Sequence, residues 1–88
     1  MKHVLNVIIL NLQDKTTGQY LDSFDDIETR DKNFDKWVCL AKNLCSVGPI
    51  EKERIIKNTD NGQIDEYTEV KEIISNANLR FVIMKFPY

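Results

Sequence analysis

The side chains that could perform catalysis are few and scattered in this chain. His3 is the single histidine, so the sequence supports neither a Ser–His–Asp triad nor a histidine-rich metal site. Cys39 and Cys45 fall in one segment of helical periodicity, which separates them by about 9 Å along the axis, too far for a disulfide. We therefore expect free structural thiols, no enzymatic activity and a reducing, cytoplasmic location.

Acidic residues between positions 22 and 35 are a second group that could do chemistry. Carboxylate oxygens are the ligands that divalent cations prefer, but Arg30 and Lys32 interrupt this group and its spacing is irregular. Residues 57–68 have Gly62 where a calcium-binding loop needs it, but lack carboxylates at the first and third positions. We expect no metal and no cofactor, and a solvated acidic segment comprising Asp22, Asp25, Asp26, Glu28, Asp31 and Asp35.

Basic residues along one expected strand suggest a nucleic-acid interface. The net charge of −2, from 12 basic and 14 acidic residues, argues against binding through the nucleic-acid backbone by the whole domain. A local patch could still contact RNA phosphates and bases. An edge strand protected by its charges is the competing interpretation. RNA binding is thus an alternative function, assigned to Lys52, Arg54, Lys57, Tyr67 and Arg80.

The hydrophobic pattern predicts the elements that must position these residues. Runs rich in β-branched residues predict strands at 4–12 and 79–86. Mostly polar strands at 51–58 and 63–67 flank Asn61-Gly62, which favours a hairpin turn. Apolar residues at i, i+3, i+4 and i+7 predict helices at 33–47, capped by Asp31 or Asn33, and at 69–77, capped by Thr68.

The order of these elements predicts one α+β domain covering residues 1–88. It matches the βαββαβ order of a ferredoxin-like sandwich, with two helices on one face of an antiparallel sheet. Residues 19–24 could add an extra strand that pairs with the first as a hairpin. No segment approaches the ~20 apolar residues of a membrane span.

The two outer strands carry more apolar side chains than two helices could cover. Both are apolar on both faces, and an exposed apolar patch usually marks an interface. Residues 13–32 could cover the second face through Tyr20, Leu21, Phe24 and Ile27. Otherwise the face would bind a protein partner or a second copy of the chain. The interface residues predicted on this basis are Leu5, Val7, Ile9, Val82, Met84 and Phe86.

Three resemblances add to these expectations. Residues 7–12, VIILNL, resemble the first-strand motif of RNA-recognition-motif domains, which implies a ferredoxin-like fold. The strand ending near Asp14 is similar to that of small ferredoxin-like nucleases of the Cas2 and VapD kind, which implies metal-dependent cleavage by this aspartate as a further alternative. The whole chain, short and rich in Asn, Asp, Ile and Lys, resembles small accessory proteins of T4-like bacteriophages. That resemblance implies a host-interaction protein that binds and inhibits a host factor in the host cytoplasm.

Overall fold

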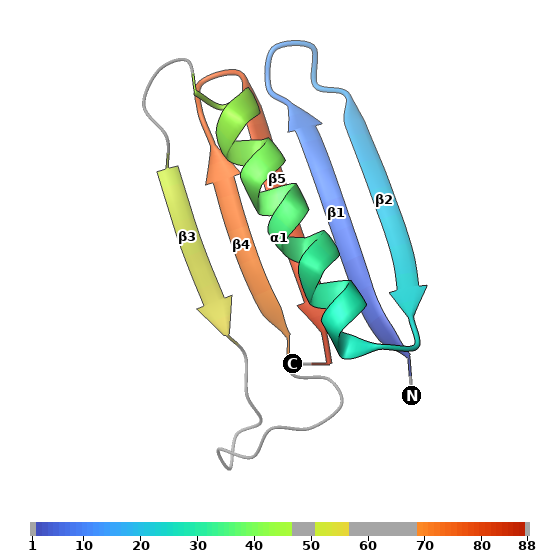
Figure 1. The fold of residues 1–88 in the computed structure, drawn as a ribbon. Coiled ribbons are helices and arrows are strands. Elements are labelled where there is room, and N and C mark those ends of the chain that lie inside the picture. Colours follow the sequence, from blue (N-terminus) through green and yellow to red (C-terminus); the bar gives the residue numbers. More distant parts are fainter. Residues whose placement is uncertain (1, 47–50, 57–68, 88) are drawn as a thin grey trace.

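The computed structural model describes residues 2–46, 51–56 and 69–87. They form five strands and one helix, in the order β-β-α-β-β-β (Figure 1). The bounds are β1 His3–Asn11, β2 Thr17–Phe24, α1 Ile27–Leu44, β3 Glu51–Ile56, β4 Val70–Ser75 and β5 Leu79–Phe86.

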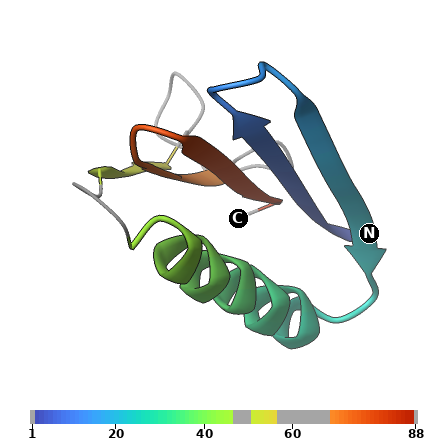
Figure 2. The same cartoon turned by 90° about the horizontal axis from the view of Figure 1, so that it is seen from above.

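All five strands belong to one antiparallel sheet of order β2-β1-β5-β4-β3. Strand β5 therefore occupies the middle, between the first strand and β4. Helix α1 lies across one face of the sheet, and no other described element lies on either face (Figure 2). The predicted βαββαβ sandwich with two helices on one face is therefore wrong: the sheet is antiparallel, but it has five strands in a different order and a single helix among the described residues.

The first two strands form a hairpin, as the optional strand at 19–24 anticipated. The turn is held by short-range bonds: Asn11 Oδ1 accepts from the backbone N–H of Gln13 at 3.0 Å, and Asp14 Oδ1 from that of Thr16 at 3.0 Å. Lys15 takes the left-handed conformation, with φ of 61°. Residues 17–24 therefore extend the sheet sideways instead of folding over it.

Helix α1 begins six residues before the predicted start at residue 33. Asp26, and not Asp31 or Asn33, is the N-cap, and its carboxylate accepts from the backbone N–H of Thr29 at 3.0 Å. The stripe that packs on the sheet consists of Arg30, Phe34, Val38, Ala41 and Cys45. The first of these is charged, which is why an apolar pattern does not reveal the first turns.

The predicted helix at 69–77 is wrong, because residues 70–75 form strand β4. Side chains alternate between buried and half-buried positions along it, as in a strand with one covered face. Asn76 ends the strand in a tight turn: its Oδ1 accepts from the backbone N–H groups of Asn78 and Leu79, both at 2.8 Å. The predicted hairpin at Asn61-Gly62 and strand 63–67 lie outside the described residues.

The core lies between α1 and the sheet. Strand residues at alternate positions and the inner stripe of the helix contribute to it, and full burial of such a side chain stabilises the fold by about 1.5–3 kcal/mol. Its buried hydrophobic members are Leu5, Val7, Phe34, Val38, Ala41, Cys45, Val70, Ile74, Phe81 and Ile83.

Candidate docking surface on the open sheet face

The two faces of the sheet differ in what covers them. On β1, Leu5 and Val7 are fully buried beneath α1, so the side chains at the alternate positions 4, 6, 8 and 10 point to the opposite side. We call that opposite side the open face, because no described element packs on it (Figure 2). Its half-buried apolar side chains are Val4, Ile8, Leu10, Ile55, Ile73, Val82, Met84 and Phe86, and Leu21 on β2, opposite Asn6, is exposed on the same face.

Strand register aligns these side chains in rows across the open face. The central row has Ile8 on β1 opposite Val82 on β5, and Val82 opposite Ile73 on β4. Gln19 on β2 and Glu53 on β3 flank this row at its two ends. Because cross-strand neighbours on one face pack together, the row is a continuous apolar strip with polar ends.

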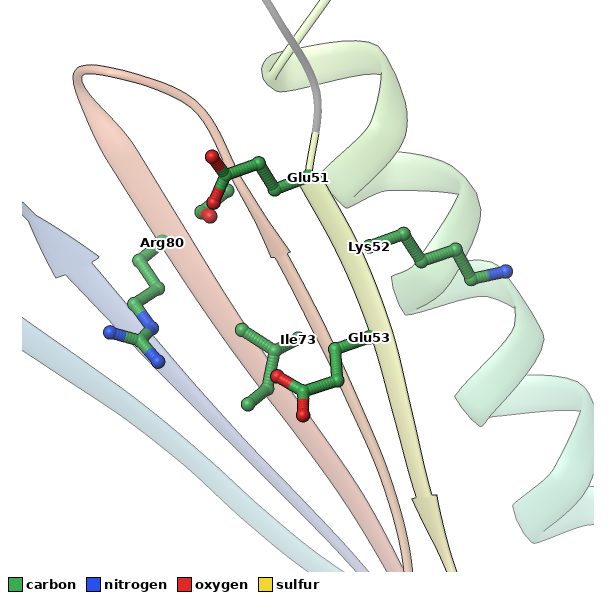
Figure 3. Close-up of a pocket in the computed structure, with 6 residues that line it drawn as sticks. Glu51, Lys52, Glu53, Ile73 and Arg80 are labelled. Atoms are coloured by element: carbon green, nitrogen blue, oxygen red, sulfur yellow. The ribbon is translucent and has the colours of Figure 1, made fainter.

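The row towards the β4–β5 turn contains charged residues and a hollow. Arg80 on β5 pairs with Ser75 on β4, which pairs with Glu51 on β3. Together with Glu53 and Ile73 these residues line an open depression of about 410 Å³. Figure 3 shows the carboxylates of Glu51 and Glu53 on one side of it and the guanidinium of Arg80 on the other. The hollow can thus receive a polar or charged group beside the apolar strip.

Polar groups also border the strip on β1 and β2 and towards the start of β4. Gln19 Nε2 donates to Asn6 Oδ1 at 3.1 Å, which fixes both amides on the open face. Next to Met84 on β4, Lys71 is close enough to Glu69 for an ion pair, with 3.9 Å between Nζ and Oε1. The open face therefore combines apolar contact area with hydrogen-bonding and charged groups around it, as protein-binding surfaces do.

Register also decides where the predicted interface residues lie. Val82, Met84 and Phe86 are on the open face, but Leu5 and Val7 have 0% exposure and belong to the core, and Ile9 packs against that core. The prediction combined two faces, because Val7 stands opposite Ile83 and not opposite Val82. The β1 residues that share a face with Val82 are Val4, Ile8 and Leu10.

The structure separates the basic residues assigned to RNA. Lys52 and Arg54 lie on the helix side of β3, where their side-chain nitrogens are 3.8 and 3.9 Å from the Glu72 carboxylate. Arg80 lies on the open face, and Figure 3 shows Lys52 extending away from it. Lys57 and Tyr67 lie outside the described residues. The described basic residues therefore do not form one patch.

Asp14, the residue of the nuclease alternative, serves the β1–β2 turn. It accepts from both the hydroxyl and the backbone N–H of Thr16, at 2.7 and 3.0 Å, and these hydrogen bonds lower its pKa. No group of three or more His, Cys, Asp or Glu side chains in the described part of the chain could hold a metal ion. The acidic segment is likewise divided: Asp25 pairs with Lys2, Asp26 caps α1, and Asp31 binds Arg30.

The histidine lies on β1, whereas the two thiols lie on α1 and at its C-terminal end. Nδ1 of His3 is buried at the start of β1 and has no hydrogen-bond partner among the described residues. Cys39 is exposed on α1, whereas Cys45 is buried in the core, where desolvation raises the pKa of its thiol. No disulfide joins them.

Comparison of the chain with protein-family models, with curated proteins and with solved structures gave no match. No helix in residues 2–46, 51–56 and 69–87 is long and apolar enough to cross a lipid bilayer.

Proposed function

We propose that this protein is a small non-enzymatic binding protein of the bacteriophage accessory kind, which docks on a host protein through the open face and blocks it. The observation that carries the proposal is the apolar strip on that face, which no element of the described residues covers. Side chains such as Ile8, Val82 and Ile73 are held in rows by the sheet, so they need little further ordering when a partner binds.

The charged hollow at one end of the apolar strip makes this surface selective for particular partners. An apolar strip alone would accept many partners, whereas the charges beside it favour a partner with complementary groups. A lysine or arginine side chain could lay its aliphatic stem on Ile73 and place its cationic head near Glu51 and Glu53. Arg80 would favour a carboxylate on the same partner. We therefore expect a partner surface that is apolar, with an adjacent basic and acidic pair.

The test is affinity capture from a bacterial lysate with three versions of the chain. Wild-type protein is compared with Val82→Lys, which places a charge in the middle of the apolar strip. The matched control is Cys39→Lys, because Cys39 is exposed on α1, away from the open face. Circular dichroism and urea unfolding establish that the variants remain folded, and an RNase-treated arm separates protein from RNA partners.

The proposal expects one protein to be captured by the wild type and the control and lost with Val82→Lys. With that protein purified, the Kd of the complex should rise at least about tenfold for Val82→Lys, as for a residue at the centre of an interface. Equal capture by all three versions would refute docking through the open face. Capture that disappears after RNase treatment would favour RNA binding instead.

A further inference from the structure

The two edge strands of the sheet differ in how they are protected. Strand β3 begins with four consecutive charged residues, Glu51 to Arg54, which discourage pairing with another strand. Strand β2 has eight residues and a single charge, Asp22. Leu21 on β2 is 63% exposed, more than any other large hydrophobic residue of the described chain. The edge of β2 therefore lacks the features that keep an edge strand unpaired.

The hydrogen-bonding pattern of β2 shows which backbone groups its outer edge presents. Asn11 N–H donates to the Thr16 carbonyl at 2.9 Å, and bonded pairs recur at every second residue of an antiparallel ladder. Residues 18, 20, 22 and 24 thus direct their N–H and C=O groups at β1. The same groups of Gln19, Leu21 and Ser23 point outwards, and no described strand lies beside them (Figure 1). Within the strand, the Ser23 N–H donates to Asp22 Oδ1 at 2.8 Å, whereas Gln19 and Leu21 are at the centre of the exposed edge.

We infer that β2 pairs antiparallel with β2 of a second copy of this chain, across a two-fold axis at Leu21. In this register Leu21 faces its own counterpart and exchanges both backbone hydrogen bonds with it. Tyr20 faces Asp22 of the other copy, two residues that already bond within one chain, where the phenol donates to the carboxylate at 2.9 Å. The single charge of the strand then meets a hydrogen-bond donor and no like charge.

Apolar residues of α1 on the helix side of β2 also favour a second copy of the chain as the partner. The Tyr20 ring contacts Trp37 of α1, with ring centroids 5.5 Å apart. Leu40 and Leu44 follow Trp37 at helical spacing on the same flank and are 43% and 51% exposed. Pairing of two β2 strands places both copies of this flank on one side of a joined sheet, facing each other across the axis. The two open faces become one continuous surface.

The test is the molecular mass of the full chain by sedimentation equilibrium, compared between two proline variants. Ser23→Pro removes an outward N–H, together with its local bond to Asp22 Oδ1, and spares the bonds to β1. Thr17→Pro acts at the end of the strand, outside the centre of the pairing. The wild type and Thr17→Pro should have twice the chain mass. Ser23→Pro should dissociate at least about 100-fold more easily, with unchanged circular dichroism, and Leu21→Lys should behave likewise.

Hydrogen exchange gives an independent readout of the same pairing. In the dimer the amides of Gln19 and Leu21 should exchange slowly, and dilution to the monomer should release both together while the amides of Tyr20 and Asp22 stay protected. A monomeric wild type at millimolar concentration would overturn the inference, as would a dimer that persists in Ser23→Pro and Leu21→Lys. Neither measurement involves the open-face partner, so failure here leaves the proposed function to its own test.

Discussion

The guanidinium group of Arg30, near the start of α1, donates a hydrogen bond from Nη1 to the backbone carbonyl of Pro87, immediately after β5. Arg30 is only 1% exposed, although it is charged. Its Nε and Nη2 also donate to Asp31 Oδ1, at 3.0 and 2.8 Å, and the Lys85 amino group reaches the same oxygen at 3.3 Å. The first turns of the helix are therefore fastened to the far end of the central strand.

Replacing Arg30 with methionine should destabilise the fold by about 1–3 kcal/mol, because the aliphatic stem is preserved but the hydrogen bonds are lost and the Pro87 carbonyl is left without this donor. Urea unfolding measures the change. Arg80→Met is the matched control, since Arg80 is exposed on the open face, and it should stay within about 0.5 kcal/mol. An equal loss of unfolding free energy in the two variants would mean that the buried guanidinium does not stabilise the fold.

Acid should weaken the contribution of Asp31. Partial burial raises the pKa of this carboxyl, but the hydrogen bond from Arg30 and the charges of Lys85 and Arg30 outweigh it, so that the folded-state pKa lies below the ordinary 3.8. As the pH falls, the unfolded chain binds the proton first, so the stabilisation is complete above the unfolded value and disappears through the lower, folded value.

The difference in urea midpoint between wild type and Asp31→Asn measures this dependence. It should be constant from about pH 7 to about pH 5 and should shrink below about pH 4. Using the difference removes the contributions of Asp14, Asp25 and Asp26, whose lowered pKa values weaken both proteins in acid alike. A difference that stays the same down to about pH 2 would contradict the ion pair as its origin.

Neighbouring isoleucines on β4 should respond differently to truncation. Ile74 is fully buried against α1, and Ile74→Ala should cost about 2–5 kcal/mol. Ile73 lies half-buried on the open face, and Ile73→Ala should cost about 1 kcal/mol. Urea unfolding of both variants tests the strand directly, because the predicted helix has both residues in its apolar stripe and would give similar costs.

The two thiols should differ in reactivity by about tenfold or more, since only an accessible thiolate reacts. Cys39 is exposed, whereas Cys45 is buried and its pKa is raised by desolvation. Alkylation of the native protein by iodoacetamide, followed by mass spectrometry, should label Cys39 first. In Cys39→Ser, labelling should become rapid only in denaturant, and rapid labelling of the native variant would contradict the buried position.

The elements that could be predicted from sequence are those whose hydrophobic period is uninterrupted. Strand β5 was predicted with its observed bounds, β1 within one residue at each end, and the apolar centre of α1 was recognised. Two predictions were wrong, the start of α1 and the helix at 69–77, and in each segment a charged residue occupies a buried position. Arg30 occupies the inner stripe of α1, and Glu72, 6% exposed, occupies the helix-facing row of β4.

Glu72 shows why the strand was taken for a helix. Val70, Glu72 and Ile74 all face α1, but a carboxylate in the middle hides the alternation. The remaining apolar residues, at 70, 73, 74 and 77, satisfy helical spacing. The burial of Glu72 depends on Lys52 and Arg54 of β3, which are distant in sequence. A pattern confined to one segment cannot contain that information.

The docking surface was only half predictable for a similar reason. Alternation along each strand shows which residues share a side, but not which sides of two strands coincide. The pairing of Ile8 with Val82 depends on register between strands at opposite ends of the chain. The excess of apolar residues could therefore be predicted from the sequence, but which of these residues lie together on the open face could not.

The central place of β5 in the sheet has a consequence for how the protein is made. During translation β1, β2 and α1 are synthesised before residues 79–86. The hairpin and the helix therefore lack, for that time, the strand that lies between β1 and β4 in the sheet. During that interval Leu5, Val7 and Phe34 have no Phe81 or Ile83 to shelter them. The nascent chain should depend on chaperones until β5 emerges, and then complete its core in a single cooperative step.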